Sequence, residues 1–240
     1  MQHDNVFLFA TGNRHKRREF EGLLDEFLSP TWQLHDLTDW PEPMPDIEED
    51  ADTFVGNAIK KAGDASRVAN CTTMADDSGL EVDALDGRPG VYSARFAGED
   101  ATDADNNAKL IEELQGVPDS ERTARYVCVT ALAIANQKVG REILRRLHTN
   151  FQDVPAGDLR EEAELTRVED RLFIWFRGTV EGRIIDEARG DGGFGYDPHF
   201  YVPRWDKTMA EVPMAKKNSV SHRAEAARKL VDYFPSGRKP

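Results

Sequence analysis

Two pairs of adjacent carboxylates are the residues whose type and spacing most directly suggest chemistry. Glu48-Glu49 lies in a Pro-rich acidic loop, and Asp76-Asp77 follows residues 72–75, which have the pattern of a short strand. Carboxylate oxygens suit Mg²⁺, which proteins commonly hold with one or two carboxylates plus substrate phosphates. A hydrated loop explains the first pair equally well, and turn chemistry before Gly79 explains the second. The residue types alone leave both interpretations open.

A polar turn near the N-terminus joins the apolar residues 6–10 to a helical pattern. Its backbone N–H groups, flexible glycine, side-chain amide and cation stand at the positive end of a helix, where a polyphosphate can bind. The spacing differs from GxxxxGK[ST], so the turn is not a Walker A loop, and an ordinary helix entry also explains it. The turn consists of Thr11, Gly12, Asn13, Arg14, His15 and Lys16.

A glycine-rich aromatic segment and a polar triplet complete the candidate residues. Residues 192–198 carry two aromatic side chains and a carboxylate among three glycines, which lets the backbone approach a flat ligand while a ring stacks on it. Ser221-His222-Arg223 opens a helical pattern with an N-cap and two donors suited to carbonyl oxygens. A β-turn with aromatic packing and a capped surface helix are the alternatives.

Strands and helices in alternation must position these residues. The hydrophobic pattern predicts strands at 6–10, 72–75, 80–84 and 125–135, and two more at 172–176 and 179–185 around a turn at Gly182. The second carboxylate pair therefore falls at the C-terminal end of a strand. This order of elements predicts an α/β protein with a mixed sheet.

The helices are predicted from apolar stripes and capping residues. The first follows the polar turn, and its stripe is Phe20, Leu23, Leu24 and Phe27. The second begins near Asp52 or Thr53, capped by Asp50 or Asp52, and ends near Ala69. The third is capped near Thr102 and buries Ala108, Leu110, Ile111 and Leu114, and the last runs over about 221–234.

The composition limits which binding partners and which cellular location we expect. The net charge of −13 argues against nucleic acid, whose binders gather Lys and Arg on a basic face, whereas a small anion needs only local cations or a metal. No segment approaches the roughly 20 apolar residues of a membrane span, and no secretory signal is expected. Cys71 and Cys128 form no CxxC pair, so we expect neither disulfide nor zinc site, and a cytoplasmic location.

Taken in order, these segments resemble the inosine triphosphate pyrophosphatase family, which acts on non-standard purine nucleoside triphosphates. The resemblance covers residues 9–19, 48–62, 75–105 and 192–227, and its most specific stretches are 75–80, 90–95, 192–198 and Ser221-His222-Arg223. It implies an elongated mixed β-sheet flanked by helices, two lobes with the active-site cleft between them, and a homodimer. Without repeats or linkers, residues 1–240 are expected to form a single such domain.

The resemblance also implies which residues bind phosphate and metal. The turn at 11–16 and Lys217 bind phosphates, while Glu48 and Asp77 hold Mg²⁺, for which Mn²⁺ can substitute. Asp77 is in addition the base that accepts a proton from water. Asn57 and Lys61, four residues apart on one helix face, can point at the same site. Glu49 and Asp76 are further candidate metal ligands.

Base recognition is implied for a second group of residues, which are Ser78, Phe194, Gly195, Tyr196, Asp197, His222 and Arg223. Ser78 contacts the nucleotide, the segment 194–197 frames the base, and the last two residues donate to its keto groups. Donors aimed at a 6-keto oxygen are left unpaired by the 6-amino group of adenine, and buried unpaired donors reject an analogue by roughly 10⁴ to 10⁵.

The implied reaction converts ITP, dITP or XTP to the monophosphate and pyrophosphate, which cleanses the nucleotide pool. Water attacks the α-phosphorus while Mg²⁺ neutralises charge on the phosphate oxygens, and Lys16 and Lys217 stabilise the leaving group. Two rival functions remain. A pyrophosphatase for other modified nucleotides does not need His222-Arg223, and a non-catalytic nucleotide sensor does not need Asp77.

Residues 137–170 depart from the family's pattern, because an extra segment replaces a short connection. Ile143, Leu144, Leu147 and Phe151 fall at helical spacing among arginines, and the acidic run 160–164 follows. We expect an added amphipathic helix that packs on its own domain rather than on a partner subunit, since burial within the chain needs no partner.

Overall fold

The structure, a computed structural model, describes residues 5–24, 33–41, 44, 47–146, 165–168 and 171–233. Phe27, Leu147, Phe151 and the acidic run 160–164 lie outside these residues, as do the side chains of Arg14, His15, Leu23 and Leu24. None of the helices in the described ranges has the length and apolar character needed to span a membrane.

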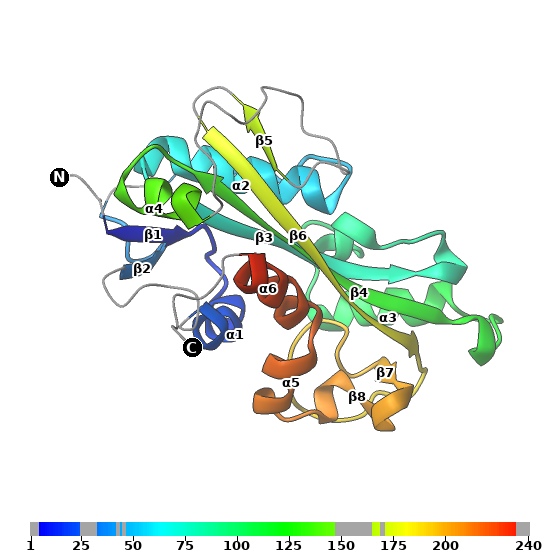
Figure 1. Cartoon of the computed structure of the whole chain (residues 1–240). Helices are drawn as coiled ribbons and strands as arrows, with labels where there is room; N and C mark the ends of the chain where they lie inside the picture. The colour runs from blue at the N-terminus through cyan, green and yellow to red at the C-terminus, as the bar shows by residue number, and fades with distance from the viewer. Residues whose placement is uncertain are drawn as a thin grey trace. The chain divides into compact units, whose positions relative to one another are not determined.

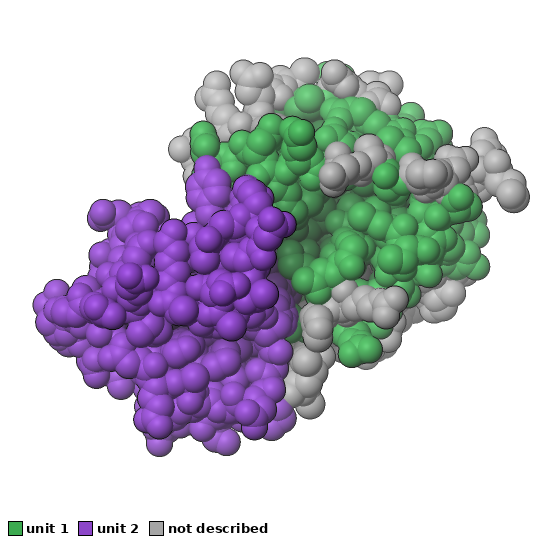
Figure 2. All heavy atoms as spheres, turned by 180° about the vertical axis from the view of Figure 1, so that it is seen from behind, with its two compact units in different colours: residues 1–77, 129–177, 226–240 green, residues 78–128, 178–225 purple. Residues whose placement is uncertain are grey.

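The chain divides into two compact units (Figure 2). Unit 1 comprises residues 1–77, 129–177 and 226–240, and unit 2 comprises residues 78–128 and 178–225. Four elements contribute residues to both units (Figure 1). They are the strands β3 (Thr73–Val82), β4 (Thr123–Ile134) and β6 (Arg171–Ile184), and the helix α6 (His222–Tyr233).

In unit 1 the strand order is β2-β1-β3-β4-β6. β1 (Val6–Phe9) pairs in parallel with β2 (Gln33–Asp36) and with β3, whereas β5 (Leu165–Val168) pairs antiparallel with β6. The sheet is therefore mixed, as predicted. Every residue of β1 is buried, which is typical of a strand covered on both faces.

Three further helices belong to unit 1: α1 (Arg14–Leu24), α2 (Phe54–Ala69) and α4 (Lys138–Arg146). The prediction that Asp50 or Asp52 caps α2 is wrong. Thr53 is the cap, and its Oγ1 accepts a hydrogen bond from the Gly56 N–H at 3.0 Å, which satisfies a donor that the helix itself cannot.

The amphipathic helix expected in the segment 137–170 is present as α4. Val139, Ile143 and Leu144 are buried within the chain, so the apolar face of the described part packs intramolecularly, as expected. The role of the rest of that segment stays a prediction, because residues 147–164 lie outside the described residues.

In unit 2 the order is β3-β4-β6-β7-β8, with β7 (Phe200–Val202) antiparallel to β6 and to β8 (Lys207–Thr208). α3 (Asp103–Glu113) begins with a capping box between Thr102 and Asp105, and α5 (Met214–Val220) precedes α6. The core contains Leu80, Leu110, Leu114, Tyr126, Val180 and Phe200.

Four predictions about these elements are wrong. Asp76 and Asp77 lie inside β3, not at its end, and β6 is one strand of 14 residues rather than two. Gly182 lies within β6 and is not a turn. A glycine is needed there because a Cβ would come 2.6 Å from the Phe200 ring of β7. Ala108 is exposed, and α5 was not predicted.

Candidate active site

The acidic pair of β3 is held by two different helices of unit 1. Successive residues of a strand point to opposite faces of the sheet, and accordingly the two aspartates have different partners. Asp76 pairs with Lys16 of α1 at 3.0 Å. Asp77 accepts a hydrogen bond from Asn57 of α2 at 3.0 Å. Both carboxylates are buried, so their charges are compensated by designated partners rather than by water.

Lys61 connects Asp77 to the acidic loop that precedes α2. Its Nζ lies 2.8 Å from Glu49 Oε1 and 3.8 Å from Asp77 Oδ1. Asn57, one turn earlier on α2, also accepts a hydrogen bond from Ala51 N at 2.9 Å through Oδ1. The two side chains on this helix face thus fix both the loop and the buried aspartate, as their spacing predicted.

Burial and neighbouring charges set the protonation of this cluster. Burial raises the pKa of Asp77 above its ordinary value, and Glu49 adds to the rise, while Lys61, Lys16 and the hydrogen bond from Asn57 oppose it. Burial lowers the pKa of Lys61, but the charges of its carboxylate neighbours outweigh burial and raise that pKa. Lys61 is therefore a cation at neutral pH, and Asp77 is a carboxylate of raised basicity.

The turn between β1 and α1 carries the predicted phosphate-binding residues. Asn13 N donates to Thr11 Oγ1 at 3.1 Å, and Lys16 N donates to Asn13 Oδ1 at 3.3 Å. Gly12 is exposed and has no atom within 4 Å of the position of a Cβ. The side chains of Arg14 and His15 lie outside the description, so within it Lys16 is the cation of this turn that reaches the acidic pair.

The structure places Glu49 in the cluster and leaves Glu48 outside it. Glu48 is exposed, and its charge acts on Lys60, which pairs with Asp50 at 2.5 Å. Glu49 instead contacts Lys61 and influences Asp77. Adjacent loop residues thus have different partners here, and the metal ligand of this loop, Glu48 or Glu49, stays a prediction.

The donor set fits a hard divalent cation. Glu49, Asp76 and Asp77 face two lysines, which leaves one negative charge in excess. Among the described residues no three His, Cys, Asp or Glu side chains converge as a ready metal site. Mg²⁺ needs only one or two carboxylates when phosphate oxygens and water complete its shell, so these carboxylates suit it in the presence of a triphosphate.

In unit 2, a buried ion pair organises the glycine-rich loop. Lys217 Nζ lies 2.5 Å from Asp197 Oδ2, and the same oxygen accepts a hydrogen bond from Phe194 N at 3.1 Å. Tyr126 of β4 also donates to Asp197, and its ring stacks on His222 with centroids 4.9 Å apart and planes at 15°. The structure thus groups Lys217 with the residues predicted to frame the base.

Arg223 joins two more of the predicted base-recognition residues. Its Nη2 donates to Ser78 Oγ at 2.8 Å, and its guanidinium lies 5.3 Å from the centre of the Phe194 ring, within reach of a cation–π interaction. Tyr196 behaves differently from Phe194. Its side chain is buried and its hydroxyl donates to Ser93 O at 2.8 Å, so it anchors the loop rather than offering a free ring.

Sequence reasoning missed Tyr126. The residue lies in a strand whose pattern reads as continuous core, and nothing in that pattern separates it from the aliphatic residues around it. Burial raises its pKa far above the ordinary value, and the charge of Asp197 adds to the rise. Its hydroxyl therefore stays protonated and donates to Asp197. This hydrogen bond satisfies a polar group that is buried within a strand.

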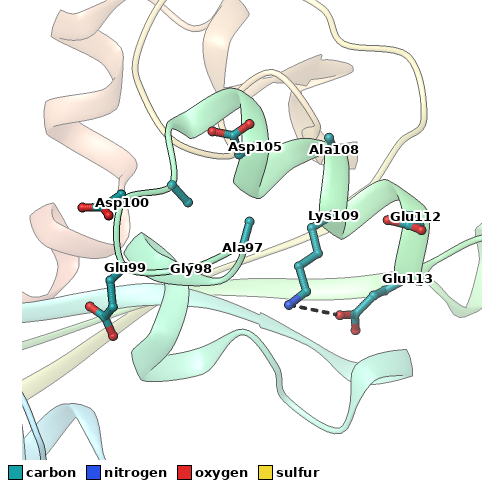
Figure 3. Close-up of a pocket in the computed structure, with 10 residues that line it drawn as sticks. Ala97, Gly98, Glu99, Asp100, Asp105, Ala108, Lys109, Glu112 and Glu113 are labelled. Atoms are coloured by element: carbon teal, nitrogen blue, oxygen red, sulfur yellow. Dashed lines mark ion pairs between the residues drawn. The ribbon is translucent and has the colours of Figure 1, made fainter.

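A separate hollow lies beside α3 in unit 2 and contains none of these residues. Carboxylates dominate its lining, and Lys109 reaches toward Glu113 at 3.8 Å (Figure 3). Its lining residues all fall between Ala97 and Glu113. The hollow therefore lies apart from the predicted substrate-binding residues along the chain.

Known proteins match this chain over nearly its whole length. The model of the Ham1 family matches residues 7–233. A dITP/XTP pyrophosphatase from Desulforamulus reducens is 44% identical over 228 residues, covering 95% of this chain and 94% of that protein. One from Geobacter sulfurreducens is 42% identical over 225 residues, covering 94% of each chain.

Solved structures show the same likeness. A HAM1 protein from Coxiella burnetii is 35% identical with a TM-score of 0.72, covering 95% of this chain and 96% of that chain. The Staphylococcus aureus Ham1 protein is 34% identical with a TM-score of 0.70, covering 95% and 97%. The α/β fold class predicted from the motifs is confirmed. Because the family model and these relatives each span nearly the whole length, the chain belongs to the Ham1 family.

Proposed function

We propose that this protein hydrolyses non-standard purine nucleoside triphosphates, such as dITP, XTP and ITP, to the monophosphate and pyrophosphate. The observation that carries the proposal is the buried carboxylate of Asp77. It is held by Asn57 and Lys61 and is next to a second buried carboxylate, that of Asp76. The relatives named dITP/XTP pyrophosphatase, more than 40% identical over most of the chain, support the substrate class.

Asp77 is the proposed base. A water oxygen attacks the α-phosphorus, the bond to the bridging oxygen of the β-phosphate breaks, and pyrophosphate leaves, while Asp77 accepts the water proton. Its raised pKa favours this role, because a base works best when its pKa approaches the working pH. Mg²⁺, when bound, supplies charge neutralisation on the phosphate oxygens and acidifies water.

The lysines of unit 1 have distinct proposed roles. Lys61 lies between Glu49 and Asp77 and keeps the base ionised until it receives a proton. Lys16 sits at the start of α1, where backbone N–H groups and the helix dipole favour an anion, and it stabilises charge on the leaving pyrophosphate. Its pairing with Asp76 holds it in place before substrate arrives.

The cluster of unit 2 is proposed to read the base. Phe194 provides a ring beneath Arg223, and donors from Arg223 and His222 match a 6-keto oxygen. Adenine would leave these donors unpaired, which rejects it by roughly 10⁴ to 10⁵. Asp77 and Ser78 are consecutive in β3, so the chain itself links the residues proposed for catalysis to those proposed for recognition.

The first test measures pyrophosphate release from dITP, XTP, ITP, ATP and GTP, each with Mg²⁺ and with chelator. We expect metal-dependent release confined to the inosine and xanthosine nucleotides. Equal rates on all five would keep the pyrophosphatase and refute the base assignment. Tight binding of ITP without release would refute the enzyme and favour a nucleotide sensor.

The metal ligand is tested by a matched pair of variants. Glu49→Gln and Glu48→Gln remove the same charge from neighbouring loop positions, but Glu49 alone contacts Lys61 in the described structure. We expect Glu49→Gln to raise the Mg²⁺ concentration for half-maximal rate and Glu48→Gln to leave it near the wild-type value. The opposite result would return the metal to Glu48.

We also propose that the protein works in the cytoplasm. Neither cysteine is in a disulfide and both are buried, and burial raises the pKa of Cys71 to about 11, so this thiol stays protonated and unreactive. Expression as a tagged protein followed by fractionation tests the location, and recovery in the membrane or secreted fraction would refute it.

A further inference from the structure

Gly195, at the centre of the glycine-rich loop, is held through both of its backbone polar groups by side chains of α3. Asp103 Oδ2 accepts a hydrogen bond from Gly195 N at 2.7 Å. Asn107 Nδ2 donates to Gly195 O at 2.9 Å. The two side chains are four residues apart, one helical turn, and therefore lie on the same helix face. We call this pair of contacts the α3 clamp.

The clamp is itself fixed. Asn107 Nδ2 also donates to Asp103 O at 2.8 Å, so its two amide hydrogens are divided between the helix and the loop and the amide cannot rotate without losing both. α3 is anchored by Leu110, which is fully buried, and by Asn106. The side-chain amide of Asn106 donates to Ala94 O at 3.0 Å and accepts a hydrogen bond from Ala97 N at 2.8 Å. The loop is thus attached to a helix that is itself anchored by a buried side chain and by hydrogen bonds.

The residues on either side of Gly195 carry the proposed base recognition. Phe194 precedes it, lies beneath Arg223 and donates its N–H to Asp197. Tyr196 follows it and is anchored on Ser93. The clamp therefore sets the position of the backbone between the ring that contacts the base and the carboxylate that pairs with Lys217.

We infer that Asp103 and Asn107 are positioning residues for purine selectivity: they hold Gly195, and through it the ring of Phe194, where Arg223 can read the base. The inference rests on the proposed function. It places neither residue in contact with the nucleotide. Asp103 is exposed, so its hydrogen bond contributes little to the stability of the fold. A shift of about 1 Å in a positioned group can nevertheless cost about 10²-fold in rate.

Asp105 supplies a matched control two residues away. It lies in the same first turn of α3 and closes the capping box with Thr102, at 2.9 Å to the Thr102 N–H and 2.6 Å to Oγ1. Asp105→Ala therefore weakens the start of the helix while leaving both contacts to Gly195 in place. Asp103→Ala removes one contact to Gly195 and leaves the capping box, so the pair separates positioning from helix stability.

The experiment measures kcat and KM for XTP and ATP in wild type, Asp103→Ala, Asn107→Ala, the double variant and Asp105→Ala, together with the midpoint of thermal unfolding. We expect each clamp variant to lower the XTP-to-ATP ratio of kcat/KM by about 10-fold or more, within the 10²-fold range of a misplaced group. The double variant should lose little more than either single variant, because both contacts hold the same residue, Gly195. Asp103→Asn, which keeps an acceptor oxygen, should restore most of the ratio.

Two results would overturn the inference: an unchanged ratio in Asp103→Ala, or an equal fall in Asp105→Ala. Hydrogen exchange provides a readout that needs no activity. The Gly195 amide should exchange faster in Asp103→Ala than in Asp105→Ala, and equal rates would exclude the clamp. A wild-type protein that releases no pyrophosphate from any nucleotide refutes the proposed function instead, and the exchange comparison then decides the clamp by itself.

Discussion

Replacing Gly193 by alanine tests whether the buried Asp197–Lys217 pair organises the base-recognition loop. Gly193 has φ +81°, and a Cβ there would lie 1.9 Å from Asp197 Oδ2 and 2.7 Å from Lys217 Nζ. Atoms cannot approach so closely, so the pair must move. Gly195→Ala is the matched control, because Gly195 also has positive φ, +61°, but nothing lies within 4 Å of its Cβ position.

The two variants share one cost and differ in another. An alanine at positive φ costs about 1–2 kcal/mol of stability, and both variants incur it. Gly193→Ala also displaces a buried ion pair, and breaking such a pair costs about 3–5 kcal/mol because a charge is left uncompensated. Lys217 and Asp197 side chains are only 5% and 9% exposed, so water compensates little of this loss.

The assay combines urea unfolding with pyrophosphate release from XTP and ATP. We expect Gly195→Ala to lose about 1–2 kcal/mol of unfolding free energy and to retain substrate preference, since its N–H and C=O still meet the α3 clamp. Gly193→Ala should lose about 3–5 kcal/mol more and most of its preference for XTP. Equal losses in the two variants would refute the reasoning, because only the clash distinguishes them.

Three further predictions concern single side chains. Asp77→Asn should lower kcat by about 10²–10⁴. Its thermal midpoint in chelator should be no lower than that of wild type, because burial raises the pKa of the Asp77 carboxyl and an amide carries no charge to bury. Normal turnover would exclude Asp77 as the base. Tyr126→Phe keeps the ring stack but removes the donated hydrogen bond, so KM for XTP should rise while far-ultraviolet circular dichroism is unchanged, and an unaltered KM would make the hydroxyl dispensable. For Asp36, burial raises the pKa, but hydrogen bonds from Thr38 and Arg17 outweigh burial and lower it, so its stabilising contribution is present above about pH 4 and is lost as the pH falls through the folded-state pKa. Asp36→Asn should accordingly be less stable than wild type in urea at pH 7 and approach it at pH 2, and a difference that is constant with pH would contradict this.

Local rules predicted the elements best where one residue has one possible structural role. Thr102 followed three residues later by Asp105 forms the capping box at the start of α3, and the apolar residues 6–9 form the buried strand β1. The same rules failed at Gly182, which looked like a turn. Its role depends on how closely β7 approaches β6, and that distance is set by tertiary packing, which no local pattern contains.

The sequence indicated candidate residues for the site but not the contacts between them. Glu48 and Glu49 have the same side chain and are neighbours in sequence, and the sequence does not show that Glu49 is the one that pairs with Lys61 of α2. Tyr126 was missed because a buried strand position looks the same whether its side chain fills space or donates a hydrogen bond to Asp197. Partners distant in sequence decide both cases.

The two clusters are built on different electrostatic principles. In unit 1 three carboxylates face two lysines, so the cluster keeps a negative excess that a divalent cation can offset when a triphosphate binds. In unit 2 Asp197 is matched by Lys217, and the remaining charge is the cation of Arg223, placed over a ring. Chemistry and selectivity therefore depend on separate interactions, which is why Asp77→Asn is expected to remove turnover while Gly193→Ala removes the preference between bases.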